Sequence, residues 1–244
     1  MRAPLIAVAA LSLAAESATG RVWDINRNGW YMYFGDHQIR SKWGVHLEGQ
    51  WRRHDVIARR QQFLLRPGVN YQLSESTMVT LGYAYVKTHP YGDYPANHQF
   101  PEHRMYQQVL VKQKAGTVRL QHRFRLEQRF LGRMIPGEEG VAKLDSWRYQ
   151  DRFRHFLKAE APLGRKGDWY GAFYNEIFVN FAPKHGAGVF DQNRAYAAVG
   201  YGLGKAGKIE VGYMNQLLAR RNSPIVEVNH TLQVGFFSSL PFGK

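Results

Sequence analysis

The sequence of 244 residues contains no cysteine, and after its first twenty residues it has no continuous apolar stretch long enough for a membrane-spanning helix. Without cysteine, neither a disulfide framework nor a thiolate metal site is possible. Without a long apolar run, a helical membrane protein is excluded, and the mean hydropathy of -0.45 is that of a polar chain. A membrane β-barrel is not excluded, because only every second residue of its strands needs to be apolar.

Acidic residues are also scarce, with 19 Asp and Glu against 33 Lys and Arg, so that the net charge is +14. Strongly basic chains often bind nucleic acid. Here the basic residues are spread through alternating segments, and no zinc-finger, basic-zipper or RNA-recognition pattern occurs. We therefore expect no nucleic-acid partner, and anionic lipid head groups, lipopolysaccharide or small anionic solutes fit the charge better.

The N-terminus has the features of an export signal. Arg2 precedes a mostly small and apolar run, Ala3 to Ala15, and two small-residue cleavage patterns follow at residues 15–17 and 18–20. We expect residues 1–20 to be a cleaved signal peptide and residues 21–244 to form one domain. The alternative is a buried N-terminal helix, against which Pro4 argues mildly.

The most informative segment runs from Val118 to Phe130. Its even-numbered positions include Val118, Leu120, Phe124, Leu126 and Phe130, and its odd-numbered positions are Arg119, Gln121, Arg123, Arg125, Glu127 and Arg129. Side chains alternate between the two faces of a strand, so this strand has one apolar and one charged face. In a membrane barrel the apolar face meets lipid and the charged face lines a wet interior.

The same alternation recurs along most of the chain. Trp43 to Arg52 is a clear second example, and about eleven candidate strands follow one another, starting at Gly29–Gly35 and resuming after expected loops at 87–103 and 183–192. Bacterial single-chain barrels have an even number of strands. The sequence therefore predicts an all-β fold, a single antiparallel up-and-down membrane β-barrel of ten to twelve strands, with twelve favoured.

Tryptophans lie near the ends of the apolar faces. Membrane barrels carry such aromatic residues in girdles at the two lipid–water interfaces. The residues assigned to the girdle are Trp43, Trp51, Trp147 and Trp169.

Several short motifs resemble a known family. They are Trp30 to Gly35, Lys42-Trp43-Gly44, Glu48-x-Gln50-Trp51-Arg52, the run from Phe63 to Val69, Leu81-Gly82-Tyr83, and the Arg-rich strand 122–129. On these residues the chain resembles the bacterial proteins grouped as domain-of-unknown-function family 2490. The resemblance implies an outer-membrane-type β-barrel in a bacterium, without an assigned activity and without catalytic residues to transfer.

The charged residues expected inside the barrel are the strongest functional candidates. The basic ones are Arg119, Arg123, Arg125, Arg129, Arg148, Arg152, Arg154 and Lys158, and the expected counter-charges are Glu48, Glu127, Glu160 and Glu176. An arginine-rich wall concentrates anions, which predicts a narrow anion-preferring channel. The alternative is a structural network in which these charges pair and fill the lumen of a narrow barrel.

The sequence bears on two further classes of protein, an enzyme and a soluble binding protein. A lipid-modifying outer-membrane enzyme needs a nucleophile beside a base, and the outward histidines His122, His155 and His230 have no serine or threonine at strand spacing. We therefore expect no enzyme, no cofactor and, from the spacing of His89, His98 and His103, no metal site. A soluble periplasmic barrel that binds a ligand is the rival fold, because alternation alone does not say which face is inside.

Overall fold

A computed structural model describes residues 20–164, 168–181, 189–220 and 223–243. Residues 1–19 of the expected signal peptide lie outside the described residues. The described residues form eleven strands, and two single-turn 3₁₀ helices, η1 (Glu138–Gly140) and η2 (Gly204–Ala206), lie between them. The strands are β1 (Val22–Arg40), β2 (Trp43–His54), β3 (Arg59–Gln72), β4 (Thr77–Thr88), β5 (Phe100–Ala115), β6 (Val118–Ile135), β7 (Lys143–Pro162), β8 (Trp169–Phe181), β9 (Phe190–Gly202), β10 (Lys208–Ala219) and β11 (Ile225–Ser238).

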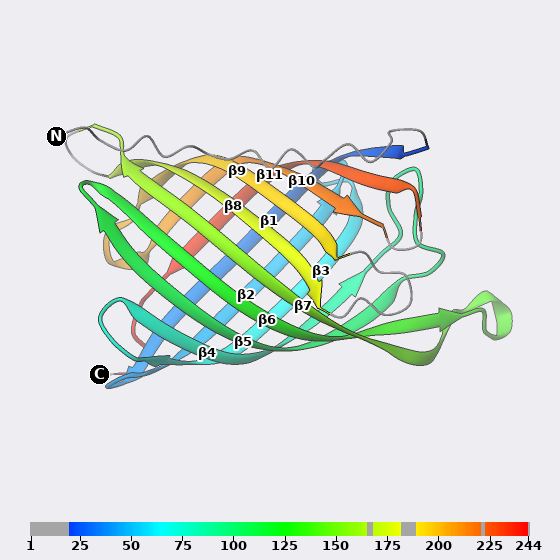
Figure 1. The fold of residues 1–244 in the computed structure, drawn as a ribbon, viewed down its shortest axis with the longest axis horizontal. Coiled ribbons are helices and arrows are strands. Elements are labelled where there is room, and N and C mark those ends of the chain that lie inside the picture. The colour runs from blue at the N-terminus through cyan, green and yellow to red at the C-terminus, as the bar shows by residue number, and fades with distance from the viewer. Residues whose placement is uncertain (1–19, 165–167, 182–188, 221–222, 244) are drawn as a thin grey trace.

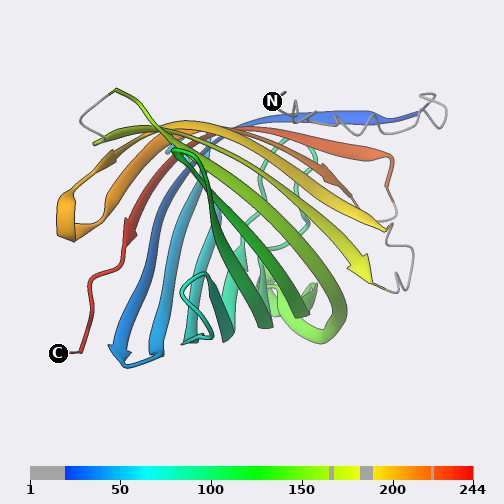
Figure 2. The ribbon, with the colours of Figure 1, turned by 60° about the vertical axis from the view of Figure 1, so that its left-hand side comes forward.

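The strands close into one barrel in which each strand pairs with its neighbours in the sequence. Figures 1 and 2 show the tilted strands following one another around the wall. All these pairs are antiparallel, and β1 and β11 close the ring as a parallel pair, from Val22 opposite Ile225 to Gly35 opposite Ser238. Closure pairs each described strand with a neighbour on both sides, although residues 143–150 of β7 extend beyond their pairing with β8.

The barrel fold and the range of ten to twelve strands are confirmed, but the favoured count of twelve and the wholly antiparallel wall are wrong. An up-and-down barrel closed only by antiparallel pairs needs an even number of strands, whereas one parallel pair permits eleven. The first strand is also much longer than the expected Gly29–Gly35, because residues 22–28 continue the alternation with Trp23 and Ile25 outside and Asp24 and Asn26 inside.

The two ends of the barrel differ. The β2–β3, β4–β5, β6–β7, β8–β9 and β10–β11 connections lie at one end, called here the loop end, and the other connections lie at the opposite turn end. The β6–β7 hairpin extends beyond the other strands at the loop end (Figure 1). Because the number of strands is odd, β1 begins at the loop end and β11 finishes at the turn end.

The faces of the strands match the alternation in the sequence. In β2, Trp43 and Trp51 are exposed on the outside, whereas Glu48 and Arg52 are buried inside. In β6, Phe124 and Phe130 are outside, and Arg125, Glu127 and Arg129 are buried inside. Polar residues thus fill the interior and large apolar residues cover the outer wall. Among the described residues, no helix is long and apolar enough to cross a membrane.

Candidate functional site: the charged lumen

The lumen formed by the described residues has a cavity toward each end. The loop-end chamber has a volume of about 380 Å³ and includes Tyr91 and Arg220 in its lining. The turn-end chamber has a volume of about 960 Å³ and includes Lys112 and Lys208. Five residues line both chambers and mark the partition between them: Trp30, Gln50, Arg66, Arg154 and Arg194.

The partition is built on paired charges, and Glu127 of β6 is its centre. Arg152 and Arg154, from the neighbouring β7, donate to its two carboxylate oxygens at 2.6 and 2.7 Å. The side chains of Glu127 and Arg125 have an exposure of 0%. Charges removed from water in this way require partners, because a buried unpaired charge is costly.

Glu176 of β8 is a second centre of the same network. It accepts hydrogen bonds from Arg123 of β6 and Arg154 of β7, both at 2.7 Å. On the opposite side of the lumen, Arg66 donates to Glu48 at 2.5 Å. Eight residues at this level are called here the central belt: Glu48, Arg66, Arg123, Arg125, Glu127, Arg154, Glu176 and Arg194.

Aromatic rings pack among the belt arginines. The guanidinium of Arg125 lies 4.7 Å from the centre of the Tyr106 ring, and that of Arg154 lies 4.4 Å from the Phe178 ring. Such cation–π contacts are stronger where the cation is shielded from water. The belt is therefore a packed layer of side chains across the middle of the barrel.

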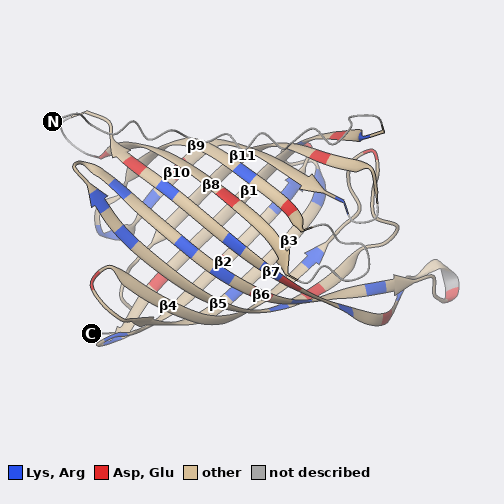
Figure 3. Cartoon of the chain, viewed as in Figure 1, with Lys and Arg blue, Asp and Glu red and all other residues tan. Residues whose placement is uncertain are grey.

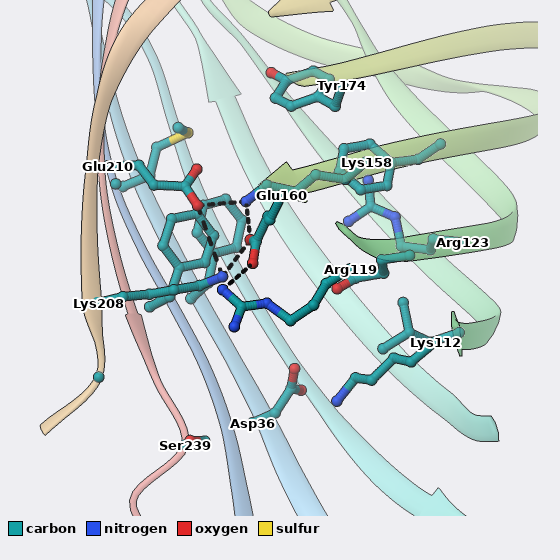
Figure 4. Close-up of a pocket in the computed structure, with 18 of the residues that line it drawn as sticks. Asp36, Lys112, Arg119, Arg123, Lys158, Glu160, Tyr174, Lys208, Glu210 and Ser239 are labelled. Atoms are coloured by element: carbon teal, nitrogen blue, oxygen red, sulfur yellow. Dashed lines mark hydrogen bonds and ion pairs between the residues drawn. The ribbon is translucent and has the colours of Figure 1, made fainter. Parts of the chain in front are cut away.

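The turn-end chamber is lined by nine basic and seven acidic side chains. Figure 4 shows how they pair: Lys158 of β7 reaches Glu210 and Glu160 at 2.5 and 3.0 Å, and Lys208 also binds Glu160. Tyr170 donates a further hydrogen bond to Glu210 at 3.0 Å. Most of the positive charge in this chamber is therefore neutralised locally.

The loop-end chamber has a different balance, with eight arginines and two acidic residues in its lining. The arginines are Arg52, Arg66, Arg104, Arg129, Arg152, Arg154, Arg194 and Arg220, and the acids are Glu102 and Glu227. Glu102 is shared by Arg104 and Arg129, at 2.6 and 2.5 Å. The carboxylates that bind Arg66, Arg152 and Arg154 lie outside this lining.

The mouth of this chamber is partly covered by the β4–β5 connection. Tyr91 in that connection donates to Glu227 of β11 at 2.7 Å, and Arg220 binds Glu227 at 2.6 Å and Asp24 at 3.0 Å. Arg220 also donates to the backbone oxygen of Tyr94. Burial, together with the Glu227 carboxylate, raises the pKa of Tyr91, which keeps its hydroxyl protonated as a donor.

The structure places the predicted basic residues in three environments. Arg125, Arg129, Arg152, Arg154 and Lys158 are buried inside the barrel, and Arg123 is nearly so. Arg119 lies at the turn end, where its side chain is 57% exposed and 3.3 Å from Glu160. Arg148 is exposed on β7, outside the lumen, because β7 continues beyond the barrel wall in the projecting hairpin. The expected counter-charges Glu48, Glu127, Glu160 and Glu176 are all buried in pairs.

Sequence reasoning missed Arg104, Arg194 and Arg220 as lumen residues. Arg104 fell between the expected loop 87–103 and a strand expected from Met105, whereas β5 begins at Phe100. Arg194 fell between the expected loop 183–192 and a strand expected from Ala195, whereas β9 begins at Phe190. The strand alternation was present in the sequence, since Glu102, Arg104, Tyr106 and Gln108 occupy every second position with polar or lumen-facing residues. Turn-forming residues nearby concealed this alternation. Basic residues are distributed along the strands rather than gathered at one end (Figure 3).

The four tryptophans of the predicted girdle all lie exposed on the outer wall. Trp43 and Trp169 begin β2 and β8 at the turn end, each beside a tyrosine, Tyr71 or Tyr201. Trp51 lies beside Tyr31 and Trp147 beside His103, both toward the loop end. Aromatic residues therefore ring the wall near both ends.

The outward histidines are held by neighbours on the same face. The Tyr213 hydroxyl lies 2.6 Å from Nδ1 of His230, and the rings of His122 and His155 stack at 5.8 Å. Within the described residues, no group of three His, Cys, Asp or Glu side chains could hold a metal ion. The expected absence of enzymatic activity stays a prediction.

Comparisons with known proteins give a family. The sequence profile of DUF2490, a protein family of unknown function, matches residues 27–226. The chain belongs to this family. A curated relative, an uncharacterised protein of Methylorubrum extorquens, is 28% identical over 249 residues, which cover 96% of this chain and 93% of the relative. Among solved structures, a NanC porin aligns with 80% of this chain and 87% of its own, at 11% identity and a TM-score of 0.44.

Proposed function

We propose that this DUF2490 protein is a bacterial outer-membrane β-barrel whose lumen favours small anions, with the central belt as the constriction. The observation that carries the proposal is the charge of the loop-end chamber, where eight arginines face two carboxylates. A narrow passage lined by one sign of charge raises the local concentration of the opposite ion. The proposal involves no catalytic step.

The outer wall supports a membrane location. Apolar side chains such as Leu65, Val69, Leu81 and Phe173 are exposed there, and aromatic residues flank them toward both ends. A soluble barrel would leave this wall in water, where exposed apolar patches of such extent are unusual. Lipid, and lipopolysaccharide for the basic residues at the ends, are the partners that this surface fits.

A filled barrel is the second candidate, and the burial of the central belt favours it. The paired side chains of Arg125 and Glu127 are fully shielded in the middle of the lumen. In that case the network would hold the barrel together and no solute would pass. The two candidates differ in conductance alone, because both have the same wall.

Planar-bilayer recording separates the two candidates. Refolded protein, shown to be folded by heat-modifiable migration on a gel, is added to a bilayer in potassium chloride. We expect discrete openings whose conductance falls when chloride is replaced by a larger organic anion and changes less when potassium is replaced by a larger cation. Folded protein that gives no openings would favour the filled barrel instead.

A further inference from the structure

Two arginines at the partition lie against the same indole ring. The Cζ of Arg52 in β2 lies 3.7 Å from the centre of the Trp30 ring, and the Cζ of Arg194 in β9 lies 5.0 Å from it. Trp30 is buried, and its Nε1 donates to Gln61 at 2.9 Å, so the ring is fixed in place. The ring therefore contacts both guanidinium groups, although β2 and β9 are far apart in the sequence.

Among the arginines that line the loop-end chamber, these two are neutralised least, because each of the others has a carboxylate within 2.7 Å. Within the described part of the chain, no carboxylate forms an ion pair with Arg52, which donates to the neutral amides of Gln50 and Gln62. Arg194 reaches Glu176 only at 3.5 Å and donates to Gln192 at 3.1 Å. Its Nε is buried and has no hydrogen-bond partner among the described residues.

Unmatched donors recur across the same partition. Three more buried atoms lack a hydrogen-bond partner in the described residues: the Nε of Arg66, the Nε of Arg123 and an Nη of Arg125. In the central belt, every buried side-chain atom that lacks a hydrogen-bond partner in the described residues is therefore a guanidinium nitrogen. A guanidinium has five N–H donors and no acceptor, so what these groups lack is an anionic or neutral acceptor. Buried positive charge in excess favours an anion.

We propose that Arg52 and Arg194 bind a small tetrahedral oxyanion, of the phosphate or sulfate type, at the floor of the loop-end chamber. The inference rests on the proposed function only in that anions enter this chamber. Guanidinium groups bind oxyanions through paired N–H donors, which a spherical halide cannot match. A small ion fits better than a large organic one, because guanidinium groups lie over the Trp30 and Phe178 rings and leave little apolar surface for a carbon skeleton.

Selenate, a heavy analogue of sulfate, tests the site directly. Crystals of the wild-type barrel soaked in selenate are expected to show an anomalous peak within hydrogen-bond distance of both guanidinium groups. A peak elsewhere in the lumen, or none, would overturn the site. This test does not depend on any variant folding.

Calorimetric titration of the refolded barrel with sulfate gives a second readout. We expect Arg52→Gln and Arg194→Gln each to weaken sulfate binding by about tenfold or more, because each removes hydrogen bonds from a charged donor. The matched control is Arg133→Gln, at a side chain that is 73% exposed on the projecting hairpin. Equal weakening of sulfate binding by all three variants would indicate non-specific attraction and contradict the site. Chloride that displaces sulfate as effectively as phosphate does would also contradict it.

The oxyanion site and the proposed channel can each be disproved without disproving the other. Anion-selective openings from a barrel without a selenate peak would remove the oxyanion site and leave the channel. A selenate peak at Arg52 and Arg194 in a barrel that never conducts would remove the channel and leave a binding site in a filled barrel.

Discussion

The two chambers of the lumen contain nearly the same number of basic residues but differ in net charge. Nine basic and seven acidic side chains line the turn-end chamber, whereas eight arginines and two acids line the loop-end chamber. In the turn-end chamber, Lys158 and Lys208 bind Glu160 and Glu210 directly across the cavity. The comparison teaches that the chambers differ mainly in where their carboxylates lie: within the lining at the turn end, and mostly outside it at the loop end.

Most of the carboxylates that bind the loop-end arginines lie behind them. Glu127 and Asp191 both bind Arg152, at 2.6 and 2.8 Å, yet neither lines the cavity. The arginines are thereby positioned by acids on one side and face the cavity on the other. The N–H donors of arginine, rather than carboxylate oxygens, therefore make up most of the charged lining of this chamber.

Cysteine labelling has the largest expected effect, because each substituted residue either reacts with the reagent or does not. It tests which of the two chambers opens to the outside of the cell. The chain has no native cysteine, so single substitutions can be labelled without background. If long loops face outward, as is usual in membrane barrels, Glu138→Cys at the loop end reacts with an impermeant maleimide in intact cells. Glu75→Cys at the turn end should react only after permeabilisation. The reverse pattern would place the cationic chamber on the periplasmic side.

Glu127→Gln should have the largest effect on stability. The substitution leaves Arg152 and Arg154 buried with less neutralisation, and breaking such a buried pair costs about 3–5 kcal/mol. Urea unfolding of the refolded barrel, followed by heat-modifiable migration, measures the loss. Glu138→Gln, at an exposed residue of η1, is the control and should change stability little. Similar stability of both variants would mean that the belt is hydrated and contributes little.

Neutralising one basic residue in each chamber tests the contrast in charge. Arg52→Gln removes an arginine that has no carboxylate partner in the described structure, so the anion-to-cation permeability ratio should fall about fivefold. Lys112→Gln removes an exposed lysine at the turn end, where solvent screens its charge, and the ratio should fall about twofold at most. Reversal potentials of the two variants give the ratios. A larger effect of Lys112→Gln would reverse the assignment of the selective chamber.

Tyr91→Phe should have the smallest effect, which is confined to the mouth of the loop-end chamber. The variant loses one hydrogen bond to the Glu227 carboxylate, which is worth about 1.5–3 kcal/mol. Hydrogen exchange of backbone amides in residues 89–99 should become about tenfold faster or more. Tyr94→Phe is the control, because Arg220 binds the backbone oxygen of Tyr94 rather than its ring. Unchanged exchange in Tyr91→Phe would show that the connection is held by other contacts.

The sequence alone predicted the faces of the strands and much of the charged wall. Alternation in Val118–Phe130 is strong enough to assign Arg125, Glu127 and Arg129 to the inside, because a strand has only two faces. The adjacency of the two arginine-rich strands was also predicted, but the register that places Glu127 opposite Arg152 comes from the structure.

Long-range features could not be predicted in the same way. The parallel closure of β1 against β11 joins residues about two hundred positions apart, and no local pattern records it. Arg52 and Arg194 meet at Trp30 for the same reason, through the curvature and register of the closed wall. Arg148 was misplaced because alternation continues where β7 leaves the barrel.

The reversal potential of wild-type protein in a planar bilayer under a potassium chloride gradient tests the central claim most directly. The excess of arginine over carboxylate in the loop-end chamber predicts a potential whose sign indicates chloride permeation in preference to potassium. A potential of the opposite sign, carried by potassium, would contradict the claim that this chamber sets the selectivity of the barrel.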